Sequence, residues 1–367
     1  MMNLFSPCIF GNLTLKNRMV MAPMTRCRAL SGNVPGPLTV MYYVQRASAG
    51  LIITEGSQVS PQGVGFNRTP GIYSMDQVTA WKEVTTAVHK EGGNIFLQLW
   101  HVGRVSHPDF LLGNLPVAPS AMPVDEEIHT PEGKKKIPIP RALLSQEIPD
   151  LILQFENGAK NAKEAGFDGV EIHGANGYLL DQFLRSGSNI RSDNYGGSIE
   201  NRMQFPLEVV RAVAGVWGPK RVGYRISPHF SLHRMSDRDP TGTFSLFTEE
   251  LNRIGIGYIH LVEPVGGRLG VTDPGLKIAP VIRTLFDGLL MLNGGYDAGT
   301  GNVVIKSGLA DLVSFGVMFL ANPDLPDRFI KNASLNSGDP STFYSGEEKG
   351  YIDYPEMDTT VKGKVPD

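Results

Sequence analysis

The sequence predicts an α/β fold, a single (β/α)8 TIM barrel with a hairpin or lid excursion after its third strand. Short apolar runs rich in branched residues recur along the chain, and segments with helical periodicity separate them. Continuous apolar runs are typical of strands buried on both faces, as in a parallel sheet. Eight such runs favour a barrel over a doubly wound sheet, since no G-x-G-x-x-G motif follows the first run.

The elements are expected in strict alternation along the chain. The eight strands are predicted at 19–23, 51–56, 95–100, 169–174, 221–228, 258–263, 289–294 and 312–316. Helices are predicted at 76–91, 148–165, 198–216, 243–254 and 298–306. Asp76 is a plausible cap for the first of these helices, and Gly166 ends the second.

One segment, roughly 113–140, is too long and too rich in proline and charge for a simple connection. We interpret it as the hairpin or lid, and its run of three lysines at 134–136 as a solvated turn. No linker-like shift in composition divides the chain. We therefore expect one domain over 1–367, with a C-terminal tail at roughly 355–367.

Composition excludes several classes of protein. The chain is 41% hydrophobic and 19% charged, so it can bury a large core. Its 34 basic and 37 acidic side chains give a net charge of -3, which indicates neither a nucleic acid nor a membrane surface as partner. Two cysteines, Cys8 and Cys27, exclude a disulfide framework and a four-cysteine zinc site. Without a signal peptide pattern or an 18-residue apolar run, we expect a cytoplasmic protein.

Active sites of barrels lie at the carboxyl ends of the strands, and unusual polar residues fall there in this chain. Arg225 interrupts the fifth apolar run, between Tyr224 and Ile226. A buried guanidinium needs an anionic or strongly accepting partner. Two interpretations stay open, a structural ion pair with a carboxylate such as Glu171 and an anionic ligand bound at the barrel mouth.

A second polar cluster, His173, Asn176 and Tyr178, follows the fourth run. The imidazole and the amide offer two donors that could converge on one carbonyl oxygen and polarise it. The phenol could deliver a proton to a carbon centre. We expect no metal site, because no further ligand stands at the required spacing, and no serine hydrolase, because G-x-S-x-G is absent.

Glycines end the last two predicted strands, where barrels commonly bind phosphate. Gly294 and Gly295 follow the seventh run and Gly316 ends the eighth. Backbone N–H groups at such positions can approach a phosphate closely. We therefore favour a phosphorylated ligand or cofactor bound at these glycines over the alternative that the glycines only form turns.

Long segments carry a resemblance to a known family, and they lie at 23–25, 96–104, 169–183, 191–202, 225–228 and 320–325. On these segments the chain resembles the old yellow enzyme family of FMN-dependent ene-reductases over essentially its whole length. Thr25, Trp100 and the Tyr351 region resemble the classical branch, since the other main branch has cysteine at the position of Thr25.

The resemblance implies a tightly but non-covalently bound FMN, with NADPH or NADH as the reductant. Hydride would pass from the flavin N5 to the β carbon of an α,β-unsaturated carbonyl or nitroalkene, in a ping-pong cycle. His173 and Asn176 would bind the carbonyl oxygen, and Tyr178 would protonate the α carbon. The flavin ring would be lined by Pro23, Met24, Thr25, Gly56 and Gln98, with Arg225 at its N1–O2 edge, its phosphate at Gly294, Gly295 and Gly316, and Phe66, Trp100 and Tyr351 as pocket walls.

The chain departs from the family pattern at two positions. Val317 stands where the family usually has an arginine that pairs with the phosphate, so we expect weaker retention of FMN. Phe66 replaces a tyrosine found in many relatives, which removes one hydroxyl group. The partner is expected to be a small activated alkene, and the protein a monomer or homodimer. Two alternatives stay open, a flavin barrel that mainly reduces nitro compounds or quinones and a non-catalytic flavin-binding protein.

Overall fold

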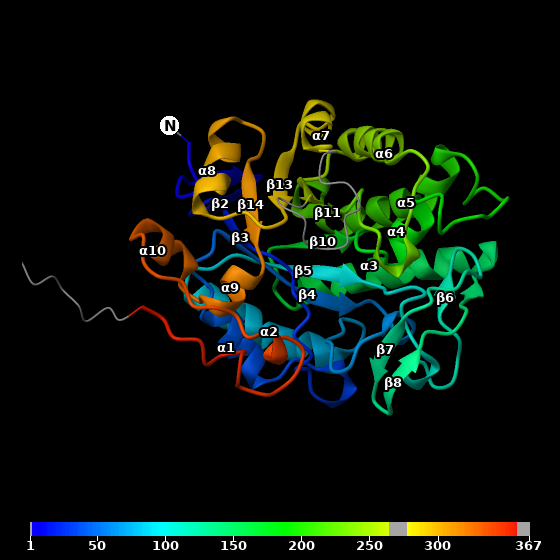
Figure 1. Cartoon of the computed structure of the whole chain (residues 1–367), viewed down its shortest axis with the longest axis horizontal. Helices are drawn as coiled ribbons and strands as arrows, with labels where there is room; N and C mark the ends of the chain where they lie inside the picture. The colour runs from blue at the N-terminus through cyan, green and yellow to red at the C-terminus, as the bar shows by residue number, and fades with distance from the viewer. Residues whose placement is uncertain (1, 264–276, 358–367) are drawn as a thin grey trace, which may run out of the picture.

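A closed barrel of eight parallel strands forms the centre of the computed structural model, which describes residues 2–263 and 277–357 (Figure 1). The barrel prediction is confirmed. The third strand has the expected ends, the second runs two residues beyond its expected end, and the others are slightly shorter than expected. The barrel strands are β3 (Met19–Met21), β4 (Leu51–Gln58), β5 (Ile95–Trp100), β10 (Gly169–His173), β11 (Val222–Ile226), β12 (Tyr258–Val262), β13 (Leu289–Asn293) and β14 (Leu312–Phe315).

The five predicted helices are present and surround the barrel. They are α2 (Met75–Lys90), α3 (Ile148–Glu164), α5 (Ile199–Trp217), α6 (Pro240–Ile254) and α8 (Ala298–Lys306). The prediction that Asp76 caps the first helix is wrong. Ser74 is the cap, because its hydroxyl accepts from the backbone N–H of Gln77, and Gln77 Oε1 in turn accepts from the backbone N–H of Ser74. Gly166 ends α3 in a left-handed conformation with φ +83°, as expected.

Several short elements were not predicted, because they span fewer than nine residues and show no clear period. The additional helices are α1 (Pro37–Val44), α4 (Leu179–Leu184), α7 (Ala279–Leu285), α9 (Val317–Ala321) and α10 (Leu325–Ile330). An antiparallel hairpin of β1 (Cys8–Phe10) and β2 (Leu13–Leu15) precedes the barrel. Its Phe10 ring packs 5.5 Å from Phe96 and 5.6 Å from Tyr258, in the cluster that fills the barrel at the start of the strands.

A β-bulge in β4 sets which of its side chains face the barrel interior. Ile53 pairs with Phe96 but Gly56 pairs with Gln98, so one extra residue of β4 lies between the two pairs. The bulge brings Gly56 to the interior opposite Gln98. Because side chains alternate along a strand, the neighbouring Glu55 then points away from the interior.

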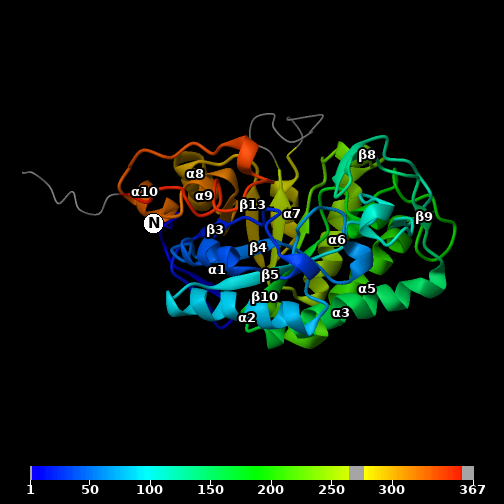
Figure 2. The ribbon, with the colours of Figure 1, turned by 90° about the horizontal axis from the view of Figure 1, so that it is seen from below.

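The segment at 113–140 contains an antiparallel hairpin of β7 (Glu127–Thr130) and β8 (Gly133–Lys136), and two-residue strands β6 (Val117–Ala118) and β9 (Arg141–Ala142) pair across its base. In Figure 2, β8 and the red C-terminal segment both lie on the upper side of the ribbon. The prediction of a turn at 134–136 is wrong, because the three lysines lie in β8, where Lys134 forms an ion pair with Glu127 and Lys135 with Asp109. A lid function stays a prediction, and the tail beyond 357 lies outside the described residues.

Across residues 2–263 and 277–357, none of the helices has both the length and the apolar character that a membrane crossing requires.

Candidate active site

A cavity of about 800 Å³ opens at the carboxyl ends of the barrel strands. Its position agrees with the general rule for barrels. Most of the site residues predicted from the sequence meet there. They are Pro23, Met24, Thr25, Gly56, Phe66, Gln98, Trp100, His173, Asn176, Tyr178, Arg225 and Val317.

The loop after β10 is bent so that three polar side chains reach the cavity. Asn176 adopts a left-handed conformation with φ +57°, which asparagine tolerates better than most residues, and Gly177 follows with φ +75°. The backbone N–H of Asn176 donates to Ser227 Oγ at 2.7 Å, and the backbone N–H of Gly177 donates to Asp181 Oδ2 at 2.8 Å. The loop is therefore fixed by its own backbone bonds, and its side chains stay free for a ligand.

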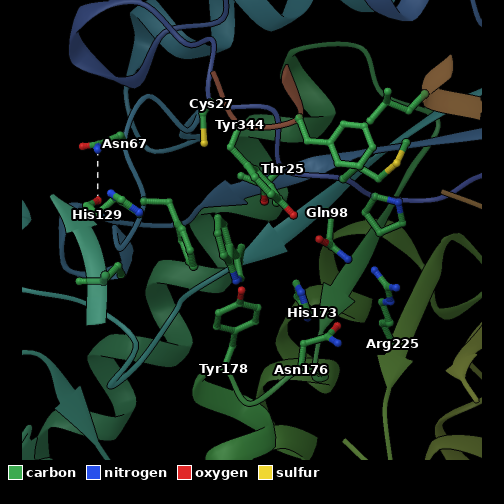
Figure 3. Close-up of a pocket in the computed structure, with 18 of the residues that line it drawn as sticks. Thr25, Cys27, Asn67, Gln98, His129, His173, Asn176, Tyr178, Arg225 and Tyr344 are labelled. Atoms are coloured by element: carbon green, nitrogen blue, oxygen red, sulfur yellow. Dashed lines mark hydrogen bonds between the residues drawn. The ribbon is translucent and has the colours of Figure 1, made fainter. Parts of the chain in front are cut away.

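His173 is a neutral donor in this setting. Burial, together with the charges of Arg225 and His260, holds the pKa of His173 well below its usual value. Its Nδ1 lies 3.3 Å from the Ala175 amide and accepts from it, so the single ring proton belongs on Nε2. In Figure 3 the side chains of His173 and Asn176 lie together between Tyr178 and Arg225. The imidazole and the amide can thus donate to one shared acceptor.

Tyr178 packs against three rings that fix its phenol. Its ring lies edge-on to His173 at 5.0 Å and to Trp100 at 5.1 Å, and 6.3 Å from Phe66. Burial raises the pKa of Tyr178 above its usual value. The phenol therefore keeps its proton across the neutral range and can act as an acid but not as a preformed base.

A buried polar chain crosses the barrel beneath these residues. Gln98 Nε2 donates to Glu171 Oε1 at 2.8 Å, and Glu171 Oε2 lies 2.8 Å from His260 Nδ1. His260 Nε2 lies 2.7 Å from Ser314 Oγ. Burial alone would raise the pKa of Glu171, but His260, Arg225 and Gln98 together lower it. The chain fixes the Gln98 amide, whose carbonyl oxygen remains for a ligand in the cavity.

The contacts of Arg225 argue against one of the two interpretations left open above, the structural ion pair with Glu171. The carboxylate of Glu171 binds Gln98 and His260, and within the described residues it forms no direct ion pair with Arg225. Arg225 Nη2 instead donates to Asn293 Oδ1 at 3.1 Å, while its buried Nε has no partner. Burial lowers the pKa of Arg225, yet a guanidinium stays charged. Within the described residues, a cation without a carboxylate partner therefore lines the cavity, as an anionic ligand would require.

Gly56 and Trp100 form the part of the cavity beside β4. A Cβ atom on Gly56 would come within 2.7 Å of the Trp100 ring. Trp100 itself stacks on Phe66 at 5.5 Å with an interplanar angle of 19°. Glycine at 56 therefore lets the Trp100 ring pack directly against the backbone of β4, as one wall of the cavity.

The predicted phosphate glycines stand beside the cavity rather than among the residues that line it. Gly294 and Gly295 have φ values of +142° and +97°, which require glycine for the turn itself. Gly316 directly precedes Val317, and a Cβ on it would lie 3.5 Å from Met24 Sδ. Their role in holding a phosphate stays a prediction.

The prediction that Tyr351 forms a pocket wall is wrong. Its side chain is fully buried and stacks on Tyr42 at 4.3 Å, away from the cavity. Tyr344, seven residues earlier, lines the cavity instead. Both residues belong to one tyrosine-rich stretch, and no local pattern distinguishes the one that reaches the cavity.

Other cavity residues were not predicted, because strands, helices and loops far apart in the sequence bring them together. They are Cys27, Asn67, Glu127, Ile128, His129, Phe230, Val262, Leu320, Phe343, Tyr344 and Ser345. Asn67 Nδ2 donates to the His129 carbonyl at 3.1 Å, the dashed line in Figure 3, and so joins the hairpin to the loop after β4.

Glu55, which the bulge turns away from the cavity, is a buried carboxylate beside it. Its Oε2 accepts from the Arg26 amide at 3.0 Å, directly after Thr25. Burial raises the pKa of Glu55 to about 7, although the Arg26 amide and the charges of Arg26 and Arg28 act to lower it.

We expect Glu55→Gln to change how folding stability depends on pH. The folded state binds the proton of Glu55 more tightly than the unfolded state, so this group's contribution falls as pH rises from about 4.5 to about 7. The variant should lose this decline, on the order of 3 kcal/mol. Urea unfolding of both proteins at pH 5 and pH 8 measures the difference. Parallel pH profiles would contradict the assignment.

Comparison with known proteins identifies the family. The model of the NADH:flavin oxidoreductase / NADH oxidase family matches residues 3–336. 12-Oxophytodienoate reductase 1 of Oryza sativa subsp. japonica is 46% identical over 362 residues, covering 97% of this chain and 93% of the relative. 12-Oxophytodienoate reductase 2 of Arabidopsis thaliana is 42% identical over 370 residues, covering 98% and 96%.

Solved structures agree with the sequence relatives. Morphinone reductase in complex with tetrahydroNAD superposes with a TM-score of 0.92 at 46% identity, covering 99% of each chain. The old yellow enzyme homologue from Zymomonas mobilis gives a TM-score of 0.94 at 43% identity, covering 97% of this chain and 100% of that one. The chain therefore belongs to the NADH:flavin oxidoreductase / NADH oxidase family, the old yellow enzyme family that its sequence resembles.

Proposed function

We propose that this protein is an FMN-dependent, NAD(P)H-linked oxidoreductase that reduces the C=C bond of α,β-unsaturated carbonyls or nitroalkenes. One observation carries the proposal. Two neutral donors, His173 and Asn176, and a protonated phenol, Tyr178, share one cavity with the cation of Arg225. Membership of the flavin oxidoreductase family and the names of its relatives support the same reaction type.

The residues present fit FMN. The cavity of about 800 Å³ has room for a planar ring system and a small molecule beside it. Gly56 lets Trp100 pack against β4 as one wall of the cavity, and the Arg225 guanidinium, which also lines the cavity, offers a positive charge to an electron-rich ring edge. Pro23, Met24, Thr25 and Gln98 would hold the ring. When bound, FMN would supply a hydride that it has first taken from NAD(P)H.

The chain's own residues would prepare the alkene and complete the reaction. His173 Nε2–H and the Asn176 amide would bind the carbonyl or nitro oxygen and stabilise the negative charge that develops on it. Tyr178 would then give its proton to the α carbon, since burial keeps the phenol protonated. His173 remains neutral throughout and so acts as a donor to the oxygen without giving up its proton.

The nicotinamide and the alkene would use this cavity in turn, which makes the cycle ping-pong. This step is supported by the size of the cavity at the strand ends, about 800 Å³, and by the tetrahydroNAD complex of the similar morphinone reductase. A near-neutral composition supports small molecules as the partners. We further propose a cytoplasmic monomer or homodimer.

An anaerobic titration tests the proposed function. The purified protein, supplied with FMN, should be yellow, bleach with NADPH or NADH, and regain its colour on addition of 2-cyclohexenone. Steady-state rates with 2-cyclohexenone, a nitroaromatic compound and menadione rank the alkene reaction against nitro or quinone reduction. A colourless protein that ignores added FMN would contradict both enzymatic readings.

Val317 leads to a prediction about cofactor retention. Its side chain lines the cavity and is 52% exposed, so an arginine would have room there. We expect Val317→Arg to lower the FMN dissociation constant by about tenfold, because it adds a charge-assisted bond to the phosphate. Val317→Met, which is long but uncharged, is the control. Fluorescence titration of free FMN measures both, and an unchanged constant for the arginine variant would refute the idea.

A further inference from the structure

The loop after β3 presents successive residues to opposite sides. Thr25 and Cys27 line the cavity, whereas Arg26 and Arg28 are buried on the other side, with 0% and 2% of their surface exposed. Cys27 has φ +58°, the left-handed region, which helps to hold this two-sided course. The loop that meets the proposed flavin site therefore also carries two buried cations.

The two arginines bind the backbone of the C-terminal segment, defined here as residues 342–351. Arg26 Nε donates to the Phe343 carbonyl at 3.2 Å, and its Nη2 to the Gly350 carbonyl at 2.6 Å. Arg28 donates to more of the segment, namely the carbonyls of Thr342 at 2.8 Å, Phe343 at 3.2 Å, Ser345 at 2.5 Å, Glu347 at 3.2 Å and Lys349 at 3.0 Å. The Arg28 guanidinium thus binds five carbonyls of the C-terminal segment, which has no regular secondary structure over most of its length.

Aromatic rings complete the attachment. Tyr351 lies 4.8 Å from the Arg28 guanidinium and 5.1 Å from that of Arg26, both over its ring face. Tyr351 stacks in turn on Tyr42 of α1. On the β4 side, Glu55 accepts from the backbone N–H of Arg26 and lies close enough to both arginines for their charges to lower its pKa. The C-terminal segment is therefore tied to the same loop that carries Thr25.

Between its anchored carbonyls, the C-terminal segment places Phe343, Tyr344 and Ser345 on the cavity. We infer that Arg28, with Arg26, is a positioning residue that shapes this segment so that Tyr344 forms the outer wall and selects alkenes by size. The selection rests on the proposed function, whereas the attachment itself is a property of the chain.

Hydrogen exchange on the FMN-loaded protein tests the attachment without any turnover. Arg28→Met keeps the aliphatic stem but removes the guanidinium. Amides of the C-terminal segment should then exchange about tenfold faster, because several charge-assisted bonds are lost together. Arg68→Met is the matched control, since Arg68 also binds this segment but through an exposed pair with Glu347, with side chains 42% and 62% exposed. Its exchange should stay within about twofold of the wild type.

Selectivity tests the positioning. We compare kcat/KM for 2-cyclohexenone and for carvone, which carries an isopropenyl group on the same ring. Arg28→Met should shift the ratio of the two values by about tenfold, chiefly through KM, as Tyr344→Ala should also do. The double variant should add no further shift, because both changes remove the same wall. Arg28→Lys, with three donors in place of a planar fork, should recover only part of the wild-type ratio.

Each outcome decides the inference. Unchanged exchange in Arg28→Met and Arg28→Lys would overturn it. So would faster exchange with a wild-type ratio, or shifts that add in the double variant. If Arg28→Met does not fold, hydrogen exchange and the kcat/KM ratio are measured on Arg28→Lys instead. If the wild type reduces no alkene, the proposed function fails, while the exchange experiment still decides whether Arg28 holds the C-terminal segment.

Discussion

Tyr178→Phe is expected to slow reoxidation of the reduced protein by an alkene by about 100-fold or more, the range of a positioned general acid. The phenylalanine ring keeps the packing against Trp100 and His173 and removes only the transferable proton. Reduction by NADPH or NADH should stay within about twofold, because that step needs no proton from the phenol. Stopped-flow absorbance, with the two half-reactions recorded separately, measures both rates.

Tyr344→Phe is the matched control for this experiment. It also removes a phenolic hydroxyl from the cavity, but from the outer wall rather than from the ring cluster around Trp100. We expect it to leave the alkene step within about threefold of the wild type. An equal loss in both half-reactions of Tyr178→Phe would remove Tyr178 from the role of proton donor.

The combined change of His173→Ala and Asn176→Gly is expected to weaken binding of a phenol by about 1000-fold, or about 4 kcal/mol, since each donor bonds a charged oxygen. A phenolate such as that of 4-chlorophenol mimics the enolate that the two donors would stabilise. Glycine is chosen at 176 because the native φ of +57° would strain an alanine. Spectral titration of the FMN-loaded protein measures the dissociation constant.

Asn67→Ala is the control for the paired donors. Asn67 also brings an amide to the cavity, but its Nδ2 is engaged with the His129 carbonyl at the rim. Its replacement should change phenol binding by less than about threefold. Binding that survives the double replacement unchanged would argue against a shared oxyanion site at His173 and Asn176.

Most of the barrel and the inner site could be predicted from the sequence, for a physical reason. A polar residue inside a buried strand costs free energy unless it has a partner or a function, so Arg225 and His173 stand out within their apolar runs. The strand ends then place them on one rim. The order of strands follows the order of the chain, which makes this topology easy to predict.

The outer half of the site depends on contacts that no local pattern shows. In our inference, Tyr344 reaches the cavity because Arg28 binds backbone carbonyls of the C-terminal segment, which lies more than 300 positions later in the chain. Backbone carbonyls carry no sequence signal, so Tyr351 and Tyr344 could not be told apart. The partner of Arg225 was undecided for a similar reason, because register alone does not show that Glu171 binds His260.

The β-bulge of β4 also limits how this protein can be engineered. Straightening the bulge without removing a residue would restore a regular ladder with β5 and invert every later side chain of the strand. Glu55 would then enter the barrel mouth, and Gly56 would turn to the helix side. A cassette transferred from a relative into 51–58 must therefore keep the bulge, with its extra residue, as well as the residue types, because the bulge decides which surface the ligand meets.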